Sequence, residues 1–90
     1  MEFGRSACGA AAAGDIVRLR ALLVRRPGEA AATDLTGYTP LHYAARAGRE
    51  DAVALLLGAG ADARSVTAAG RATPLHRAAY VGSVPVIRLL

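Results

Sequence analysis

Two histidines and one cysteine are the residues of this chain best suited to chemistry. His42 and His76 are its only histidines, and Cys8 is its only cysteine. Imidazole and thiolate groups ligate metal ions and act as general bases or nucleophiles, so a zinc site or an activated thiol is the chemistry to consider. Whether these three residues act in this way depends on the elements that hold them.

Both histidines lie in copies of one ten-residue motif. The first copy, 39–48, reads TPLHYAARAG and the second, 73–82, reads TPLHRAAYVG, so equivalent residues lie 34 positions apart. In each copy a Thr hydroxyl is suited to accept a hydrogen bond from the first helical turn, and the Pro after it has no amide to leave unpaired. The motif therefore predicts helices of about two turns that begin at Pro40 and Pro74 and end at the closing glycine.

At these residues the chain resembles the ankyrin repeat family, and the resemblance covers residues 34–90. It implies an all-α solenoid of stacked helix pairs with short β-hairpin loops. It also implies that each motif His bonds the capping Thr of its own turn and the backbone of the neighbouring repeat, which makes both histidines fold residues. The scaffold positions are Thr39, Pro40, Leu41, His42 and Gly48 in one copy and Thr73, Pro74, Leu75, His76 and Gly82 in the other.

Repeat spacing also argues against a shared metal site. Equivalent residues of adjacent repeats are expected about 10 Å apart, whereas zinc–imidazole bonds are about 2 Å long. Cys8 lies 34 residues before His42, at the expected start of a buried helix, so a packed, inert thiol is favoured over a nucleophile. No Ser–His–Asp pattern, phosphate-binding loop or carboxylate pair stands out. The sequence predicts no catalytic residues, no metal and no cofactor.

The 34-residue offset divides the chain into three segments. We expect a degenerate N-terminal capping repeat at 1–33, a complete repeat at 34–66 and a repeat cut short at 67–90. In the first segment Ser6 should cap a helix that runs to Gly14. A second helix from Asp15 should end at Pro27, followed by a plain loop over 29–33. Its apolar residues, spaced for one helical face, are Ile16, Leu19, Leu22 and Leu23.

Two hairpin loops are expected to project from the array. The stretch 34–39, DLTGYT, combines an Asp that can bond its own backbone two residues on with a Gly for positive φ. The second hairpin has one more residue between its Gly and its Thr, so its tip should bulge near Arg71 and Ala72.

The last helix is expected to be capped by Ser83 and to hold Pro85 in its first turn. Its apolar residues are Val84, Val86, Ile87, Leu89 and Leu90. The sequence stops without a polar closing repeat, which predicts a fragment, a shortened gene product or a chain whose end needs covering. We therefore expect the chain to fray from about Gly82 or to self-associate through this helix.

Composition narrows the class of protein. The net charge is +4 and all eleven basic residues are Arg, which reflects either coding bias or selection for Arg chemistry and is compatible with partners that carry an acidic patch. One cysteine excludes an internal disulfide and fits a reducing compartment. No signal sequence or membrane span is evident, so the cytoplasm or nucleus is the expected location.

The resemblance also implies a binding surface. In ankyrin proteins the hairpin tips and the exposed side of each first helix form a concave face, which here comprises Leu35, Thr36, Tyr38, Arg46, Arg71, Arg77 and Tyr80. Tyr and Arg are favoured at interface centres, although any helical repeat exposes some residues and Arg is common in this chain. We expect a non-catalytic protein-interaction module, with no membrane or small-molecule partner.

Two other functions stay open. An anionic polymer such as nucleic acid, the less favoured partner, would use the Arg residues 18, 20, 25, 26, 71 and 77. Alternatively, the chain is the targeting module of a longer enzyme. A polymer binder should lose affinity steeply with salt, whereas a protein binder should depend more on its tyrosines.

Overall fold

The computed structural model describes residues 6–68 and 70–90, and this part of the chain folds into six α-helices and one 3₁₀ helix. The elements are α1 (Ala7–Ala13), α2 (Ile16–Arg25), η2 (Pro27–Ala31), α3 (Pro40–Arg46), α4 (Glu50–Gly58), α5 (Pro74–Val81) and α6 (Val84–Leu89). The described residues contain no β-strand, so the loops follow a hairpin path without a β-ladder. None of their helices has the length and apolar character needed to cross a membrane.

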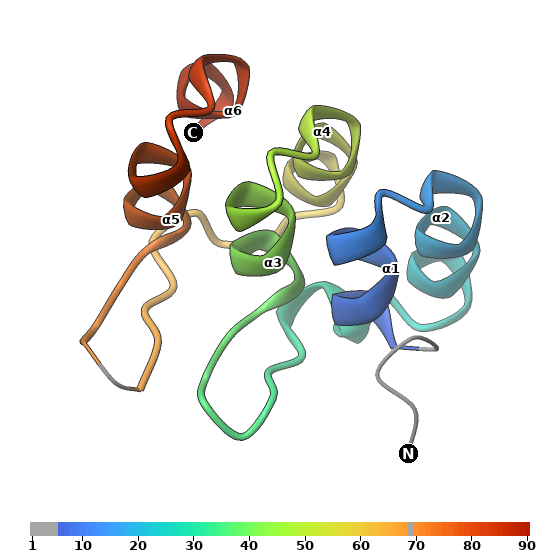
Figure 1. Cartoon of the computed structure of the whole chain (residues 1–90). Helices are drawn as coiled ribbons and strands as arrows, with labels where there is room; N and C mark the ends of the chain where they lie inside the picture. Colours follow the sequence, from blue (N-terminus) through green and yellow to red (C-terminus); the bar gives the residue numbers. More distant parts are fainter. Residues whose placement is uncertain (1–5, 69) are drawn as a thin grey trace.

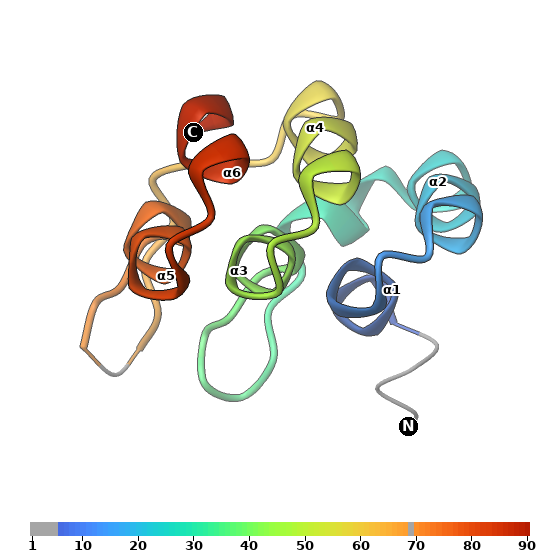
Figure 2. The same cartoon turned by 45° about the horizontal axis from the view of Figure 1, so that its top comes forward.

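The helices form two rows. Figure 1 shows α1, α3 and α5 side by side in one row and α2, α4 and α6 in the other, and Figure 2 shows the same arrangement from a second direction. Helices α1 and α3 pack together, as do α3 and α5, and each first helix also packs on its own partner. The loops that precede α3 and α5 project on the same side of the array. The all-α solenoid of stacked helix pairs that the ankyrin resemblance implies is confirmed.

The Thr–Pro signature begins both helices as predicted. The Thr39 hydroxyl accepts a hydrogen bond from the His42 amide at 3.3 Å, and the Thr39 amide donates to His42 Nδ1 at 3.1 Å. Thr73 and His76 make the same reciprocal pair. Helix α5 is capped by Gly82 in the left-handed conformation, whereas α3 is capped one residue before Gly48, by Ala47.

The first helix pair also begins where the sequence predicts. Ser6 Oγ accepts from the Gly9 amide at 3.1 Å, and Asp15 Oδ1 accepts from the Arg18 amide at 3.2 Å. The loop expected over 29–33 is partly wrong, because Pro27–Ala31 forms the 3₁₀ helix η2. Proline suits the first position of such a turn, and the turn buries Ala30 against the core.

Small residues bring the first helices close together. Ala11, Ala44, Ala45 and Ala78 belong to helices of that row and are fully buried in the core. The larger core side chains come mostly from the second helices and from the motif Leu: Leu19, Leu41, Val53, Leu56 and Val86. Close packing of this kind makes the array sensitive to volume changes in its first row.

The last helix departs from the prediction in two ways. Ser83 occupies the N-cap position, but its hydroxyl makes no capping hydrogen bond. Its ψ is 94°, unlike the 166° of Ser6, and Asp15 caps at a similar ψ of 84° with a side chain that is one atom longer. Val86 is fully buried against its own chain, so it does not belong to an open face.

Candidate functional site

His42 joins two repeats. Its side chain is fully buried, and Nε2 lies 2.8 Å from the carbonyl oxygen of Ala72 in the following repeat. Because the Thr39 amide donates to Nδ1, that nitrogen is the acceptor and Nε2 carries the proton that it donates to Ala72. The structural role implied by the resemblance is therefore confirmed for His42.

His76 makes only the local half of this pattern. It bonds Thr73 through Nδ1, with 2.9 Å between Nδ1 and the Thr hydroxyl, but its side chain is exposed. Leu75 is 44% exposed, whereas the equivalent Leu41 is fully buried. Within the described part of the chain no group of three or more His, Cys, Asp or Glu side chains is placed to hold a metal ion.

The pKa of His42 is lowered from 6.5, chiefly by burial and also by the positive charge of Arg77, although the bond to Ala72 and the charge of Asp34 act in the opposite direction. The folded protein therefore holds neutral His42, while the unfolded chain takes up a proton below about pH 6.5. The stability that depends on neutral His42 is complete above that pH and is lost as the pH falls towards the folded pKa.

We predict that the free energy of unfolding falls between pH 8 and pH 5, as measured by urea titration. His42→Gln, which lacks a titrating group but keeps a donor, should lose most of this decrease. The Asp34 carboxyl does not confuse the result, because its pKa of about 2 in the fold and 3.8 outside it place its transition at lower pH. An equal decrease in the wild-type chain and the His42→Gln variant would contradict the assignment.

The first hairpin is organised by Asp34. Its Oδ1 accepts from the Thr36 amide at 2.9 Å, from the Thr36 hydroxyl at 2.6 Å and from the Tyr38 amide at 3.1 Å, which confirms the predicted Asp turn. Tyr43 donates its hydroxyl to Oδ2. Burial raises the pKa of Asp34, but these hydrogen bonds outweigh it and lower the pKa to about 2. Burial and the bond to Asp34 raise the pKa of Tyr43 to about 12.

The two hairpins touch through backbone atoms. The Ala68 amide donates to the Thr36 carbonyl at 2.9 Å. Gly37 has a φ of +84°, and a Cβ atom at this position would lie 2.7 Å from the Ala68 nitrogen. Glycine is therefore required here both by conformation and by the close approach of the second hairpin.

The predicted tip of the second hairpin is half wrong. Arg71 has a φ of +49°, unusual for a residue with a side chain, and this fits the extra residue in the loop. Ala72 is instead buried, and its carbonyl accepts from both His42 Nε2 and the Thr67 amide. Position 72 is thus a junction between repeats, because the buried His42 of the preceding repeat donates its Nε2 proton to the Ala72 carbonyl.

Tyr38 and Arg77 come together from different repeats. Arg77 Nη1 donates to the Tyr38 hydroxyl at 3.3 Å, and the Arg77 Nε is buried without a hydrogen-bond partner among the described residues. The Tyr38 ring lies 5.5 Å from the His42 ring and 5.1 Å from the Tyr43 ring. Both residues are half-buried, so they support the fold as well as line the surface.

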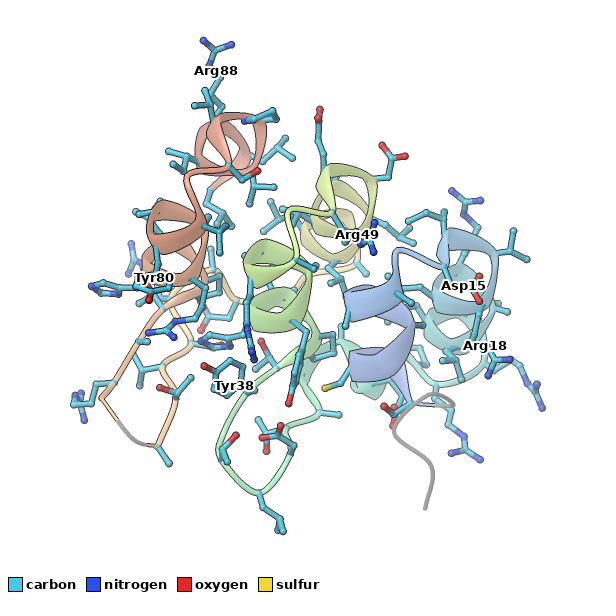
Figure 3. The ribbon with its side chains drawn as sticks, in the orientation of Figure 1. Asp15, Arg18, Tyr38, Arg49, Tyr80 and Arg88 are labelled. Carbon is cyan, nitrogen blue, oxygen red and sulfur yellow. The ribbon has the colours of Figure 1, made fainter. Side chains whose placement is uncertain are left out.

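The other predicted surface residues are exposed. Leu35 stands at the first hairpin tip, 104% exposed, and Tyr80 on α5 is 87% exposed. Arg46 occupies the position of α3 equivalent to Tyr80, one repeat away, and is also exposed. Thr36 and Arg71 lie exposed on the two hairpins. In Figure 3 Tyr80 and Tyr38 mark the α5 helix and the loop before α3, and Arg18 lies at the opposite end of the array.

The arginines proposed for polymer binding do not gather on one surface. Arg18, Arg20 and Arg25 belong to α2 in the second row, and Arg26 follows them. Arg77 belongs to α5, which is the first helix of the third pair. Figure 1 shows the second pair, α3 and α4, between α5 and α2.

Tyr43 is a surface residue that sequence reasoning missed. It lies one repeat before Arg77, at the same position of its helix, so the 34-residue offset was the available signal. Cys8 is packed as predicted: it is 6% exposed, its Sγ lies 3.9 Å from the Tyr38 carbonyl, and burial, with the nearby charges of Asp34 and Glu29, raises its pKa to about 12. A thiol with so high a pKa is a poor nucleophile.

Comparison with known proteins decides the family. Residues 7–90 match the family model described as ankyrin repeats (3 copies). The chain belongs to the ankyrin repeat family. The match includes the alanine-rich first helix pair of this ankyrin chain, which lacks the TPLH signature.

Several curated relatives resemble parts of this ankyrin chain. It is 51% identical over 49 residues to the 2-5A-dependent ribonuclease of Mus musculus, which is 54% of this chain and 7% of that protein. It is 48% identical over 60 residues to the Neurogenic locus Notch protein of Drosophila melanogaster, which is 67% of this chain and 2% of that protein. The Homo sapiens neurogenic locus notch homolog protein 1 is 48% identical over 58 residues, 64% of this chain and 2% of that protein. The chain thus spans only a small part of the length of these relatives.

Proposed function

We propose that this chain binds another protein through a concave surface made of its hairpin tips and first helices. Ankyrin repeats are generally non-catalytic protein-interaction modules, which supports this assignment at the level of the family. The proposed binding residues are Leu35, Thr36, Tyr38, Arg46, Arg71, Arg77 and Tyr80.

The observation that carries the proposal is the exposure of Tyr80. Its side chain is 87% exposed on α5, and the exposed Arg46 occupies the equivalent position on α3. The described residues give the Tyr80 side chain no hydrogen bond or ring contact. A large, rigid aromatic side chain with no role in the fold, next to arginines, is typical of the centre of a protein interface.

Two alternatives have less support. Binding of an anionic polymer needs a continuous run of cations, and the arginines of α2 and Arg77 of α5 lie in different rows and different repeats. A targeting role within a longer enzyme is compatible with the same surface, because such a role is itself protein binding.

We predict that Tyr80→Ala removes specific partners from an affinity capture with cell extract, as measured by quantitative mass spectrometry. The intact chain is compared with Tyr80→Ala and with Val17→Ala, which removes a side chain 79% exposed on α2. Proteins lost with Tyr80→Ala and kept with Val17→Ala are the expected result. Tyr38→Ala is a poorer probe because the Tyr38 ring packs on His42. The same captured proteins from all three chains would contradict the proposal.

A further inference from the structure

A cleft opens between α1 and α3, beside the proposed binding surface. Its volume is about 280 Å³, and it is lined by Ala12, Tyr43, Arg46 and Ala47. The fully buried residues of α3 include Leu41, Ala44 and Ala45, whereas Tyr43 is half-buried and Arg46 and Ala47 are exposed. The cleft therefore lies on the outward side of the first row.

The repeat offset explains why the cleft exists. Tyr43 and Arg46 on α3 correspond to Arg77 and Tyr80 on α5, so both helices carry one Tyr and one Arg at these positions, in opposite order. The matching residues of α1 are Gly9 and Ala12. Helix α1 packs closely on α3 but supplies no side chain large enough to fill the space above Tyr43. The empty space thus follows from the small residues of α1.

The wall of the cleft is held in place before any partner arrives. The Tyr43 hydroxyl donates to Asp34, and its ring lies 5.1 Å from the ring of Tyr38. A cavity of about 150 Å³ already holds benzene in a protein interior, so this cleft has room for one aliphatic or aromatic side chain. Preorganised walls of this kind lower the cost of ordering on binding.

Arg46 places a free positive charge at the cleft. Arg46 is exposed. Within residues 6–68 and 70–90 the one ion pair joins Arg18 of α2 to Asp15, the N-cap residue of that helix, so Arg46 has no carboxylate partner there. Asp34, the carboxylate bonded to Tyr43 in this wall, also accepts hydrogen bonds from Thr36 and Tyr38. Arg77 supplies a second positive charge one repeat along, and its Nε also lacks an acceptor among these residues.

We propose that the concave surface binds an extended peptide segment of a partner protein in which an acidic residue lies close to an apolar one. The apolar side chain enters the cleft between Ala12, Tyr43 and Ala47, and the carboxylate pairs with the guanidinium of Arg46. A second acidic residue further along the segment reaches Arg77. This inference rests on the proposed protein-binding function and names the class of segment that is bound.

Charge and shape together favour a peptide over a nucleic acid. Arg–carboxylate pairs are charge-assisted and often bidentate, so one or two arginines suffice to select an acidic residue. A phosphate backbone is instead held by many cations in a row, and here the arginines of α2 lie in the other row of helices. The apolar lining of the cleft also has no counterpart in a sugar–phosphate chain.

Selection from a phage-displayed library of random 12-residue peptides on the intact chain tests the proposal. We expect the enriched peptides to carry Asp or Glu within a few positions of an apolar residue. A fluorescein-labelled copy of the most enriched peptide is then titrated by fluorescence anisotropy. Arg46→Glu should weaken binding on the order of 10-fold or more, because a charge-assisted bond is replaced by repulsion. The matched control Arg20→Glu, on α2, should change it by less than about 2-fold.

Two further variants separate contact from general damage. A peptide with Lys in place of its acidic residue should bind the Arg46→Glu variant on the order of 10-fold more tightly than it binds the wild-type chain. Ala12→Leu should fill the cleft and weaken the original peptide by a similar factor, while the melting temperature stays within a few degrees. Neither result follows from a role of Arg46 or Ala12 in stability.

The failures of the two proposals are distinguishable. Enriched peptides without acidic residues that still require Tyr80 would overturn the acidic-segment proposal and leave the protein-binding function intact. Peptides whose binding is insensitive to Arg46→Glu, Ala12→Leu and Tyr80→Ala would overturn the acidic-segment proposal and would also count against the concave surface. No enrichment at all would overturn the acidic-segment proposal only. Tighter binding of a labelled oligothymidine, weakened alike by Arg46→Glu and Arg20→Glu, would support nucleic acid instead.

Discussion

His42→Ala is expected to lower the free energy of unfolding by about 1 to 3 kcal/mol, the cost of leaving buried polar groups without partners. The substitution removes the acceptor of the Thr39 amide and the donor to the Ala72 carbonyl. Both are buried, and water does not readily replace the lost partner. The measurement is chemical denaturation of the wild-type chain and the variant at pH 8.

His76→Ala is the matched control for this prediction. It removes the same local bond to Thr73, but His76 is exposed and water can replace it. The difference between the two variants therefore reports the cost of disrupting the buried site, which includes the bond that crosses from one repeat to the next. Equal losses from His42→Ala and His76→Ala would show that the link to Ala72 contributes little. Unchanged stability of His42→Ala together with loss of a bound metal, measured by elemental analysis, would overturn the structural assignment.

What the sequence predicted well depends on contacts within a few residues. The reciprocal bonds between Thr39 and His42, and the turn around Asp34, each involve residues two to four positions apart, so the residue types and their spacing suffice. The repeat offset then extended these local predictions to the whole array. Helix starts and helix pairing followed from it, whereas the burial of Leu41 and His42 did not extend to Leu75 and His76.

Several errors concern contacts that reach beyond a single turn of the chain. Ala72 was expected at a loop tip, but its carbonyl is fixed by a His thirty residues earlier. Tyr43 was missed because its role depends on a hairpin that folds back to bring Asp34 beside it. Tyr38 was assigned only to the surface, although Arg77 of the following repeat bonds its hydroxyl. Such pairings depend on how a hairpin folds back and on how closely neighbouring repeats stack, and no local pattern encodes either.

The candidate binding surface also has a part that the sequence could predict and a part that it could not. Tyr80, Arg46 and Leu35 could be predicted as exposed because they fall outside the apolar positions of their elements. The cleft beside Tyr43 could not, since it depends on how closely α1 approaches α3. The small residues at positions 9 and 12 leave a cleft only when α3 packs beside α1.

An open apolar face on the third helix pair leads to the second large prediction. Leu75, Val81, Val84 and Leu89 are 38–53% exposed on α5 and α6. Ile87 and Leu90 are half-buried against the core, so the helix is anchored on one side. Covering four side chains that are already about half-buried is worth roughly 3 to 6 kcal/mol before entropy.

Fusion of a polar consensus capping repeat after Leu90 is therefore expected to raise the melting temperature of the isolated chain by about 10 °C or more, since each kcal/mol shifts a domain of this size by about 4 to 8 °C. The fusion should also protect the amides of α6 from hydrogen exchange and abolish the self-association that we expect of the uncapped chain, as measured by light scattering. The chain itself offers a comparison: Leu41 lies on α3, against which α5 packs, and is fully buried, whereas the equivalent Leu75 on α5 is not.

Polar substitution provides an independent control for the same face. Replacing Leu75 and Val84 with Gln should abolish self-association without the added repeat, whereas Val17→Gln, on the exposed side of α2 in the first pair, should leave it unchanged. Added hydrogen-exchange protection of the α6 amides in the capped chain would show that this face is covered, because a general gain in solubility would not protect those amides. A monomer whose amides are already protected through Leu90 in the uncapped chain would show that the buried Val86 suffices to hold α6, and that the exposed face carries no cost.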